Sequence, residues 1–316
     1  MRVLITGAGG FVGPYVHAAL RKVCGDIAIV ATSKDDGSHP LIGRTETLDV
    51  TDKAAVAEAI GRHRPTHVIN LAGIAAPAVA QADPEAAWRL HLNGALNLAD
   101  AILGVAPECW LIQVGSGLAY GESAKAGLPL DETALLAPTD DYGASKAAAD
   151  LALGAVCRKG LKCVRMRPFN HTGAGQAEDY VVPAFAMQVA RIEAGLAPPG
   201  IGTGNLDAER DFLGVRDVAK AYALVVARSA ALEPNAIFNI ASGIPRRVGD
   251  ILDQLLARST VRITVERDAQ RFRANDLPRV VGDASLARAR LGWVPENDFE
   301  DTLSAGADDW RARVSG

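Results

Sequence analysis

The stretch RVLITGAGGFVG at residues 2–13 decides the fold class of this 316-residue chain. Residues 3–6 are apolar or β-branched on both parities, which is typical of a strand buried on both faces of a parallel sheet. Gly7, Gly10 and Gly13 then open a helical stretch with the spacing GxxGxxG. Without Cβ atoms this loop can turn tightly and approach a pyrophosphate, which the free N–H groups and dipole of the helix N-terminus favour. Strand, loop and helix together predict a dinucleotide-binding unit.

Outward from this unit, short β-branched runs alternate with longer Ala/Leu-rich stretches. We expect strands at 2–6, 27–32, 44–48, 67–72, 110–115 and 161–167, and helices at 11–22, 52–62, 84–104 and 141–158. This alternation predicts right-handed βαβ crossovers and an α/β fold of Rossmann type, with a doubly wound parallel sheet.

The regular alternation of strand-like and helix-like segments ends after Pro168, where glycine and proline become frequent. Helical pattern returns at 181–196, 215–229, 247–258 and 299–313. We therefore expect residues 1–168 to form the nucleotide-binding domain. Residues 169–316 are expected to form mainly a smaller C-terminal substrate lobe, with some segments returning to the sheet.

The composition excludes several classes of protein. With 33 Lys+Arg against 37 Asp+Glu, the net charge is −4, which argues against a nucleic-acid-binding protein. No apolar run approaches about 18 residues, so no membrane span is expected. The strand-like start leaves no room for a signal peptide, and the four cysteines fit reduced thiols, so a cytoplasmic protein is expected. The six histidines do not cluster, and no metal site is expected.

The end of the second expected strand indicates the type of cofactor. Enzymes that use NAD usually place Asp or Glu there, where it accepts a hydrogen bond from the ribose 2′-hydroxyl. This chain has Thr32, Ser33 and Lys34, and its first acid is Asp35. Two hydroxyls and an ammonium suit a 2′-phosphate better than a carboxylate would. We therefore expect NADP (NADPH), with NAD possible.

A second group of residues carries chemistry. Tyr142 and Lys146 stand four apart at the start of an expected helix and share one face of it, and Ser116 follows the strand at 110–115. Reducing a ketone needs a hydride on carbon and a proton on oxygen. A free phenol has a pKa of about 10, and a nearby ammonium is expected to lower it by stabilising the phenolate. Tyr142 is thus expected to move the proton, with Ser116 donating to the same substrate oxygen.

These motifs resemble the extended short-chain dehydrogenase/reductase family. The resemblance rests on the glycine loop, on the segment 70–73 (NLAG), and on Ser116, Tyr142 and Lys146. It implies that Lys146 also holds the nicotinamide ribose and that Asn93, in the segment 91–94 (HLNG), supports a proton relay to Lys146. The expected cofactor contacts are Gly7, Gly10, Phe11, Val12, Gly13, Thr32, Ser33, Lys34, Asp49, Val50, Leu71, Ala72, Gly73, Tyr142 and Lys146.

Within that list, Asp49 and Val50 follow the third expected strand and are candidates for the adenine edge. An N-cap by Thr51 or Asp52 at the next helix is an equally good interpretation of this segment.

The second half narrows the resemblance to GDP-mannose 4,6-dehydratases and GDP-6-deoxy-4-keto-hexose reductases. The segments that carry it are 167–176, 182–185 and 204–212. They imply a GDP-sugar substrate, with Arg210 paired to its diphosphate, as bidentate guanidinium groups suit phosphate oxygens. Arg273 matches a later family motif whose proline is missing here. The expected substrate contacts are Ser116, Asn170, Val182, Arg210 and Arg273.

The residues that follow Ser116 bear on the reaction. In the dehydratases an acid follows at about two positions, and the related epimerase-reductases use a cysteine just beyond the serine. Here Gly117 and Leu118 follow, and neither can move a proton. His171 is expected to pack or to contact the diphosphate rather than to act as a second acid.

We therefore expect NADPH-dependent reduction of the C4 ketone of GDP-4-keto-6-deoxy-D-mannose to GDP-D-rhamnose. The alternatives are a GDP-mannose 4,6-dehydratase, another nucleotide-sugar epimerase or reductase and, more remotely, a non-catalytic NADP-binding module. Family members pair Ala/Leu-rich helices between subunits, so a homodimer through the helices at 84–104 and 141–158 is expected.

Overall fold

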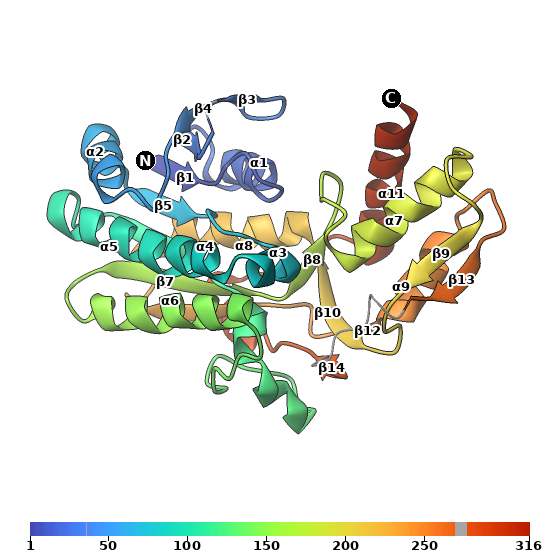
Figure 1. The fold of residues 1–316 in the computed structure, drawn as a ribbon. Helices are drawn as coiled ribbons and strands as arrows, with labels where there is room; N and C mark the ends of the chain where they lie inside the picture. Colours follow the sequence, from blue (N-terminus) through green and yellow to red (C-terminus); the bar gives the residue numbers. More distant parts are fainter. Residues whose placement is uncertain (36, 269–276) are drawn as a thin grey trace.

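The computed structural model describes residues 1–35, 37–268 and 277–316, and its centre is an eight-stranded sheet (Figure 1). The strand order is β11-β7-β6-β5-β1-β2-β4-β3. Parallel pairing joins β1 (Arg2–Thr6), β2 (Ala28–Ser33), β4 (Gly43–Thr47), β5 (His67–Asn70), β6 (Trp110–Val114), β7 (Lys162–Pro168) and β11 (Ala236–Ile240). Only the edge strand β3 (Gly37–His39) pairs antiparallel among these described strands. The order runs outward from β1 in both directions, which confirms the doubly wound α/β prediction.

Helices cover both faces of the sheet. One face carries α1 (Gly13–Cys24) and α8 (Val215–Arg228), and the other carries α2 (Lys53–His63), α5 (Gly94–Val105) and α6 (Asp141–Cys157) (Figure 1). The local sequence explains where these helices begin. Asp52 caps α2 by accepting from the amides of residues 54 and 55, which confirms the capping interpretation, and Asp140 caps α6 by accepting from Gly143 N. The caps start both helices at the carboxyl edge of the sheet.

The helix expected at 84–104 contains one widened turn. Its parts are α4 (Pro84–Trp88), a π-helical turn at Arg89–Asn93, and α5. A π turn changes the rotation of the residues around the helix axis. Here it leaves His91 buried and Asn93 exposed.

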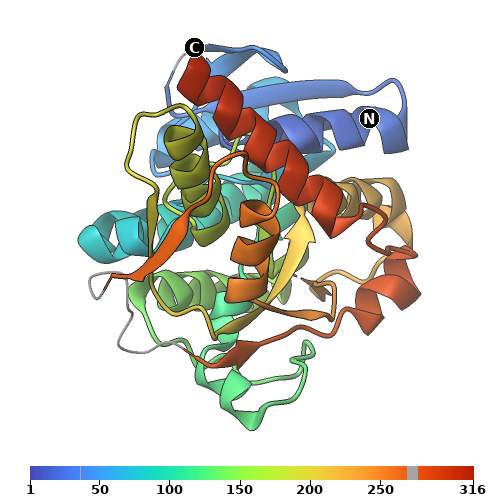
Figure 2. The ribbon, with the colours of Figure 1, turned by 90° about the vertical axis from the view of Figure 1, so that its right-hand side faces the viewer.

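Parts of the second half return to the sheet. Strand β11 pairs with β7, and α8 packs on α1. A smaller hydrophobic cluster gathers α7 (Val181–Glu193), α9 (Val248–Leu256) and α11 (Phe299–Ser315), with β9 (Gly200–Thr203) paired to β13 (Thr264–Arg267) beside them. Figures 1 and 2 show these helices standing to one side of the central sheet, with α11 against α7. The division at residues 168 and 169 stays a prediction.

Short strands link the two parts. They are β8 (Asn170–Thr172), β10 (Glu209–Gly214), β12 (Pro245–Arg247) and β14 (Arg279–Val280), with β10 paired to the other three. Two further short helices are α3 (Pro77–Ala82) and α10 (Ser285–Leu291).

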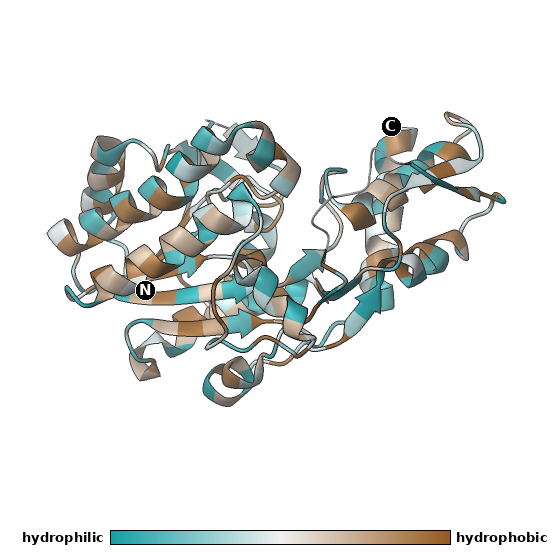
Figure 3. Ribbon diagram, turned by 60° about the horizontal axis from the view of Figure 1, so that its bottom comes forward, coloured by the Kyte–Doolittle hydropathy of each residue, from teal (hydrophilic) through white to brown (hydrophobic). Residues whose placement is uncertain are grey.

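The described helices carry hydrophilic and hydrophobic residues side by side (Figure 3). Within residues 1–35, 37–268 and 277–316, no helix has the length and apolar character that crossing a membrane requires. All four cysteines are unpaired thiols.

Candidate active site

The glycine loop is built by close backbone contacts. Gly7 has φ +66°, and a Cβ atom there would lie 2.8 Å from Ala72 N in the loop after β5. A Cβ atom at Gly13 would lie 2.0 Å from Ala8 O, so α1 packs directly on the start of the loop. The structure thus brings the glycine loop and the segment 71–73 together, as the cofactor prediction requires.

The N-terminus of α1 suits an anion. Its N-cap is Val12, and within the described residues no side chain caps it. Gly9 and Gly10 are exposed beside it. Uncapped amides at a helix N-terminus next to a glycine loop fit a bound pyrophosphate. Phe11 stacks on His171 at 6.2 Å between ring centroids and 9° between planes, which supports the packing role expected for that histidine.

The three residues at the end of β2 lie in different surroundings. Thr32 is buried, and its hydroxyl donates to Ile5 O at 3.1 Å inside the sheet. Ser33 Oγ faces the loop, 3.2 Å from where a Cβ atom of Gly9 would lie. The Lys34 ammonium is exposed, 4.0 Å from a carboxylate oxygen of Asp49. The Thr32 hydroxyl thus already has an acceptor, and a contact of Ser33 and Lys34 with a ribose substituent stays a prediction.

The segment after β4 is held by its neighbours. Asp49 accepts from the amide and the hydroxyl of Thr51, at 2.8 and 2.7 Å. Val50 is buried, and its carbonyl accepts from Asn97 Nδ2 at 3.0 Å. A contact of Asp49 and Val50 with adenine stays a prediction.

Tyr142 and Ser116 meet at the carboxyl edge of the sheet. Tyr142 lies in the first turn of α6 and is 8 % exposed, and its phenol is near enough to the Ser116 side chain for Ser116 to lower its pKa. Ser116 Oγ accepts from Leu118 N at 3.1 Å, which fixes the serine at the start of a 3₁₀ turn. Burial raises the pKa of Tyr142, and the effect of Ser116 opposes this rise only in part. The expectation that the ammonium lowers this pKa is therefore wrong for this structure.

The Lys146 ammonium lies behind the phenol. Its Nζ donates to Val114 O at 3.1 Å and lies 6.0 Å from the centroid of the Tyr142 ring. Burial lowers the pKa of Lys146 to about 8, which leaves the group mainly charged at neutral pH. A Cβ atom at Gly73 would lie 3.2 Å from Nζ, so glycine at this position lets the ammonium approach the loop after β5. The predicted serine, tyrosine and lysine are thus brought together.

The residue that the structure places beside this group is His91, which the sequence analysis did not select. Its ring lies edge-on to Tyr142, with centroids 5.6 Å apart and planes at 90°. Asn93, the residue expected to support a relay, is exposed at the end of the π turn. A buried histidine two residues before the expected asparagine was the available signal, but the π turn that buries it has no sequence signature.

The expected substrate residues lie on the short strands and on α7. Asn170 on β8 pairs in register with Phe212 on β10, and Val182 is buried at the start of α7. Arg210 on β10 stands opposite Arg246 on β12, and its Nη1 donates to Glu209 O at 2.8 Å. Arg273 lies outside the described residues.

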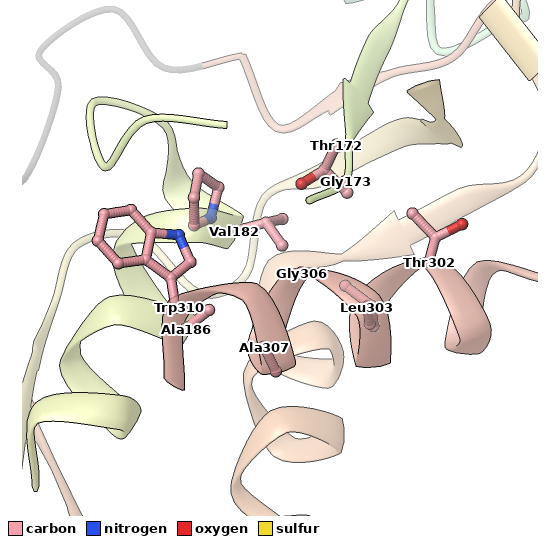
Figure 4. A pocket seen from close by; sticks show the side chains of 10 residues that line it. Thr172, Gly173, Val182, Ala186, Thr302, Leu303, Gly306, Ala307 and Trp310 are labelled. Carbon is pink, nitrogen blue, oxygen red and sulfur yellow. The ribbon is translucent and has the colours of Figure 1, made fainter. Parts of the chain in front are cut away.

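A pocket lies between β8, α7 and α11 (Figure 4). Its lining is mostly apolar: Thr172, Gly173, Val182, Pro183, Ala186, Thr302, Leu303, Gly306, Ala307 and Trp310. Val182 is the one expected substrate residue among these, and Ser116, Tyr142 and Lys146 do not line it. Within the described residues, no group of three His, Cys, Asp or Glu side chains is arranged to hold a metal ion.

A doubly wound sheet whose carboxyl edge carries a glycine loop and a Ser–Tyr–Lys group defines a dinucleotide-dependent α/β enzyme. The chain belongs to the NAD dependent epimerase/dehydratase family, whose sequence model matches residues 3–241. This confirms the resemblance that the motifs indicated.

Known sequences and structures are similar over nearly the whole chain. GDP-6-deoxy-D-mannose reductase of Pseudomonas aeruginosa is 30% identical over 314 residues, which cover 99% of this chain and 98% of the relative. The structure of RMD from Pseudomonas aeruginosa complexed with NADPH superposes with a TM-score of 0.85 at 29% identity and covers 99% of both chains. UDP-glucose 4-epimerase of Thermus thermophilus in complex with NAD superposes at 0.80 with 27% identity, covering 98% of this chain and 99% of the other.

Proposed function

We propose that this protein reduces the C4 ketone of GDP-4-keto-6-deoxy-D-mannose to GDP-D-rhamnose with NADPH. The observation that carries the proposal is the buried Tyr142 phenol near Ser116 at the carboxyl edge of the sheet, with the Lys146 ammonium 6.0 Å from the centroid of its ring. The similarity to a GDP-6-deoxy-D-mannose reductase, and to a structure complexed with NADPH, supports the choice of substrate and cofactor.

The cofactor contacts follow from the loop geometry. The amides at the start of α1 and the glycine loop would hold the pyrophosphate, and Ser33 and Lys34 would meet the 2′-phosphate. NADPH, when bound, supplies the hydride that the ketone carbon accepts. Lys146 would hold the nicotinamide ribose, as the family resemblance implies.

The protein's own part in the reaction is the proton. As the hydride reaches the carbonyl carbon, negative charge develops on the oxygen, and the Tyr142 hydroxyl donates its proton there to complete the alcohol. Ser116 donates a hydrogen bond to the same oxygen and stabilises the developing charge. Because burial raises the pKa of Tyr142, the phenol is protonated at neutral pH, which is the form a proton donor needs.

The positions beyond Ser116 favour reduction over dehydration. A Cβ atom at Gly117 would lie 3.0 Å from the Phe169 ring, so a side chain there would require the ring to shift by a few tenths of an ångström. Leu118 packs against Tyr142, and Glu122 is paired with Lys125 on the surface. These positions therefore offer no second proton-transfer group at the phenol.

The test is NADPH oxidation by the purified full chain, followed by absorbance, with GDP-4-keto-6-deoxy-D-mannose as substrate. Tyr142→Phe is expected to lower kcat by about 10²–10⁴-fold, the usual contribution of a positioned acid, and to retain NADPH binding. Tyr120→Phe is the control, since that buried hydroxyl bonds to Asn239 and Arg167 rather than to the Ser–Tyr–Lys group, and its loss should affect stability. Full activity of Tyr142→Phe would contradict the assignment. Product formed from GDP-mannose or a UDP-sugar without net NADPH consumption would favour the dehydratase or an epimerase.

We also propose that α6 pairs with its copy in a homodimer. Leu151 on its outward face is 62 % exposed, with small alanines around it. The family resemblance, whose members pair such Ala/Leu-rich helices between subunits, supports the proposal. Light scattering is expected to give twice the 33.0 kDa chain mass, and Leu151→Glu is expected to give the monomer; a monomeric wild-type protein would refute the pairing.

A further inference from the structure

His91 connects two parts of the site through both of its ring nitrogens. The residue is 1 % exposed, in the π turn before α5. Nδ1 lies 2.8 Å from Ser145 Oγ in the first turn of α6, and Nε2 lies 3.0 Å from Ile74 O in the loop after β5. The imidazole therefore bridges the loop that borders the cofactor site and the helix that carries Tyr142 and Lys146.

The partners determine the tautomer of the ring. The Ile74 carbonyl can only accept, so Nε2 carries the proton. The neutral ring then accepts at Nδ1 from the Ser145 hydroxyl, which shares its one proton between Nδ1 and Tyr142 O, 3.0 Å away. Burial and, after it, the nearby Lys146 charge lower the pKa of His91 to about 3, so the ring stays neutral across the working pH range.

The bridge lies against the reacting groups. A Cβ atom at Gly73 would lie 3.2 Å from both His91 Nε2 and Lys146 Nζ, so the imidazole and the ammonium both border this glycine. The imidazole edge also contacts the Tyr142 ring. The other groups that act on the phenol are Ser116, which lowers its pKa, and Asp140, whose charge raises it. Tyr180 and Tyr222 also lie near enough to interact with it.

We propose that His91 is a positioning residue that fixes the first turn of α6 against the loop after β5, and so sets where the Tyr142 hydroxyl and the Lys146 ammonium stand. The proposal deepens the proposed function, since it takes Tyr142 as the proton donor. It requires that loss of the bridge impairs the chemical step more than substrate binding. It also requires that water gains access to Lys146 once the bridge is lost.

The chain offers a matched control in His67. This histidine is also buried and neutral, and its Nε2 lies 2.9 Å from Ser229 Oγ, but it begins β5 at the opposite, amino edge of the sheet. His91→Ala and His67→Ala each remove a buried ring bonded to a serine hydroxyl. We expect His91→Ala to lower kcat about tenfold with the KM for the sugar nucleotide within about twofold, and His67→Ala to leave both at the wild-type values.

A second readout does not depend on turnover. The pH dependence of Lys146 acetylation by a trace of labelled anhydride, followed by mass spectrometry, reports the pKa of its amine. Because burial holds this pKa down, His91→Ala is expected to raise it by about one unit, a tenfold change in the fraction deprotonated. His67→Ala is expected to leave it unchanged.

Ser145→Ala cuts the same bridge at its other end with a smaller change of volume. It is expected to shift kcat, and the pH midpoint of Lys146 acetylation, in the same directions as His91→Ala does. If His91→Ala does not fold, Ser145→Ala alone tests the role of the bridge. Wild-type kcat and a wild-type Lys146 midpoint in Ser145→Ala, or equal effects of His91→Ala and His67→Ala, would overturn the proposal. A wild-type chain that does not oxidise NADPH with any nucleotide sugar would instead refute the proposed function, and the acetylation midpoints would still decide the role of His91.

Discussion

Gly13→Ala tests whether the glycine loop holds the cofactor. The added methyl carbon would lie 2.0 Å from Ala8 O, and ordinary van der Waals contact begins at 3.4 Å. The loop or the helix must therefore move by about 3.4 − 2.0 = 1.4 Å. The clash is with main-chain atoms, which cannot rotate away as a flexible side chain would. Such overpacking usually costs about 1–3 kcal/mol of stability. A displacement of about 1 Å in a positioning element can cost about 10²-fold in rate.

The assay is a fluorescence titration with NADPH, together with urea unfolding of the same samples. Gly13→Ala is expected to weaken NADPH binding at least about tenfold. Gly104→Ala in α5 is the control, because a Cβ atom there meets nothing within 4 Å, and it is expected to stabilise the protein by up to about 1 kcal/mol. NADPH affinity equal to that of the wild type in a folded Gly13→Ala variant would refute the reasoning.

Three further predictions concern the cofactor, the core and pH. Lys34→Glu, on a side chain 76% exposed, is expected to weaken NADPH binding about tenfold while sparing NADH; equal effects on both would exclude a 2′-phosphate contact. Asp150→Asn replaces the carboxylate that Arg165 and Arg167 contact at 2.6 and 2.9 Å with a neutral amide. It is expected to lower the free energy of unfolding in urea by about 3–5 kcal/mol. A loss under about 1 kcal/mol would show that the buried charges find other partners. Burial lowers the pKa of His67 from 6.5 to about 4, so the unfolded chain takes up its proton first, and stability falls as the pH drops from about 6.5 to 4. His67→Ala should therefore lose about 2 kcal/mol less than the wild type between pH 7 and 5, and an unchanged pH dependence would contradict this.

The first half of the chain could be predicted well because its elements are long and regularly patterned. The expected strands at 2–6 and 110–115 match β1 and β6, and the expected helices at 52–62 and 141–158 match α2 and α6 within a residue or two. Buried strands in a parallel sheet have continuous apolar sequences, and a capping residue in the sequence indicates where a helix begins. The residues that follow such elements, Ser116 and Tyr142 among them, were therefore found.

In the second half the expected helices match α7, α8, α9 and α11, but the short strands were harder to predict for physical reasons. Its linking strands β8 and β12 have three residues each, too few to show a two-residue period, and their pairing is fixed by β10 in a distant part of the chain. Strand β11 depends in the same way on its contact with β7. Hydrophobic pattern indicates which residues are buried and does not indicate which distant segment buries them.

The pKa of Tyr142 shows how the tertiary arrangement decides the chemistry. Spacing alone suggests an ammonium that lowers the pKa of the phenol, since Tyr142 and Lys146 share a helix face. In the structure the ammonium donates to Val114 O instead, and burial of the phenol dominates. A phenol with a raised pKa is a poor base but a protonated group at neutral pH, ready to donate. A protonated phenol at this position fits the proton-donor role proposed for Tyr142.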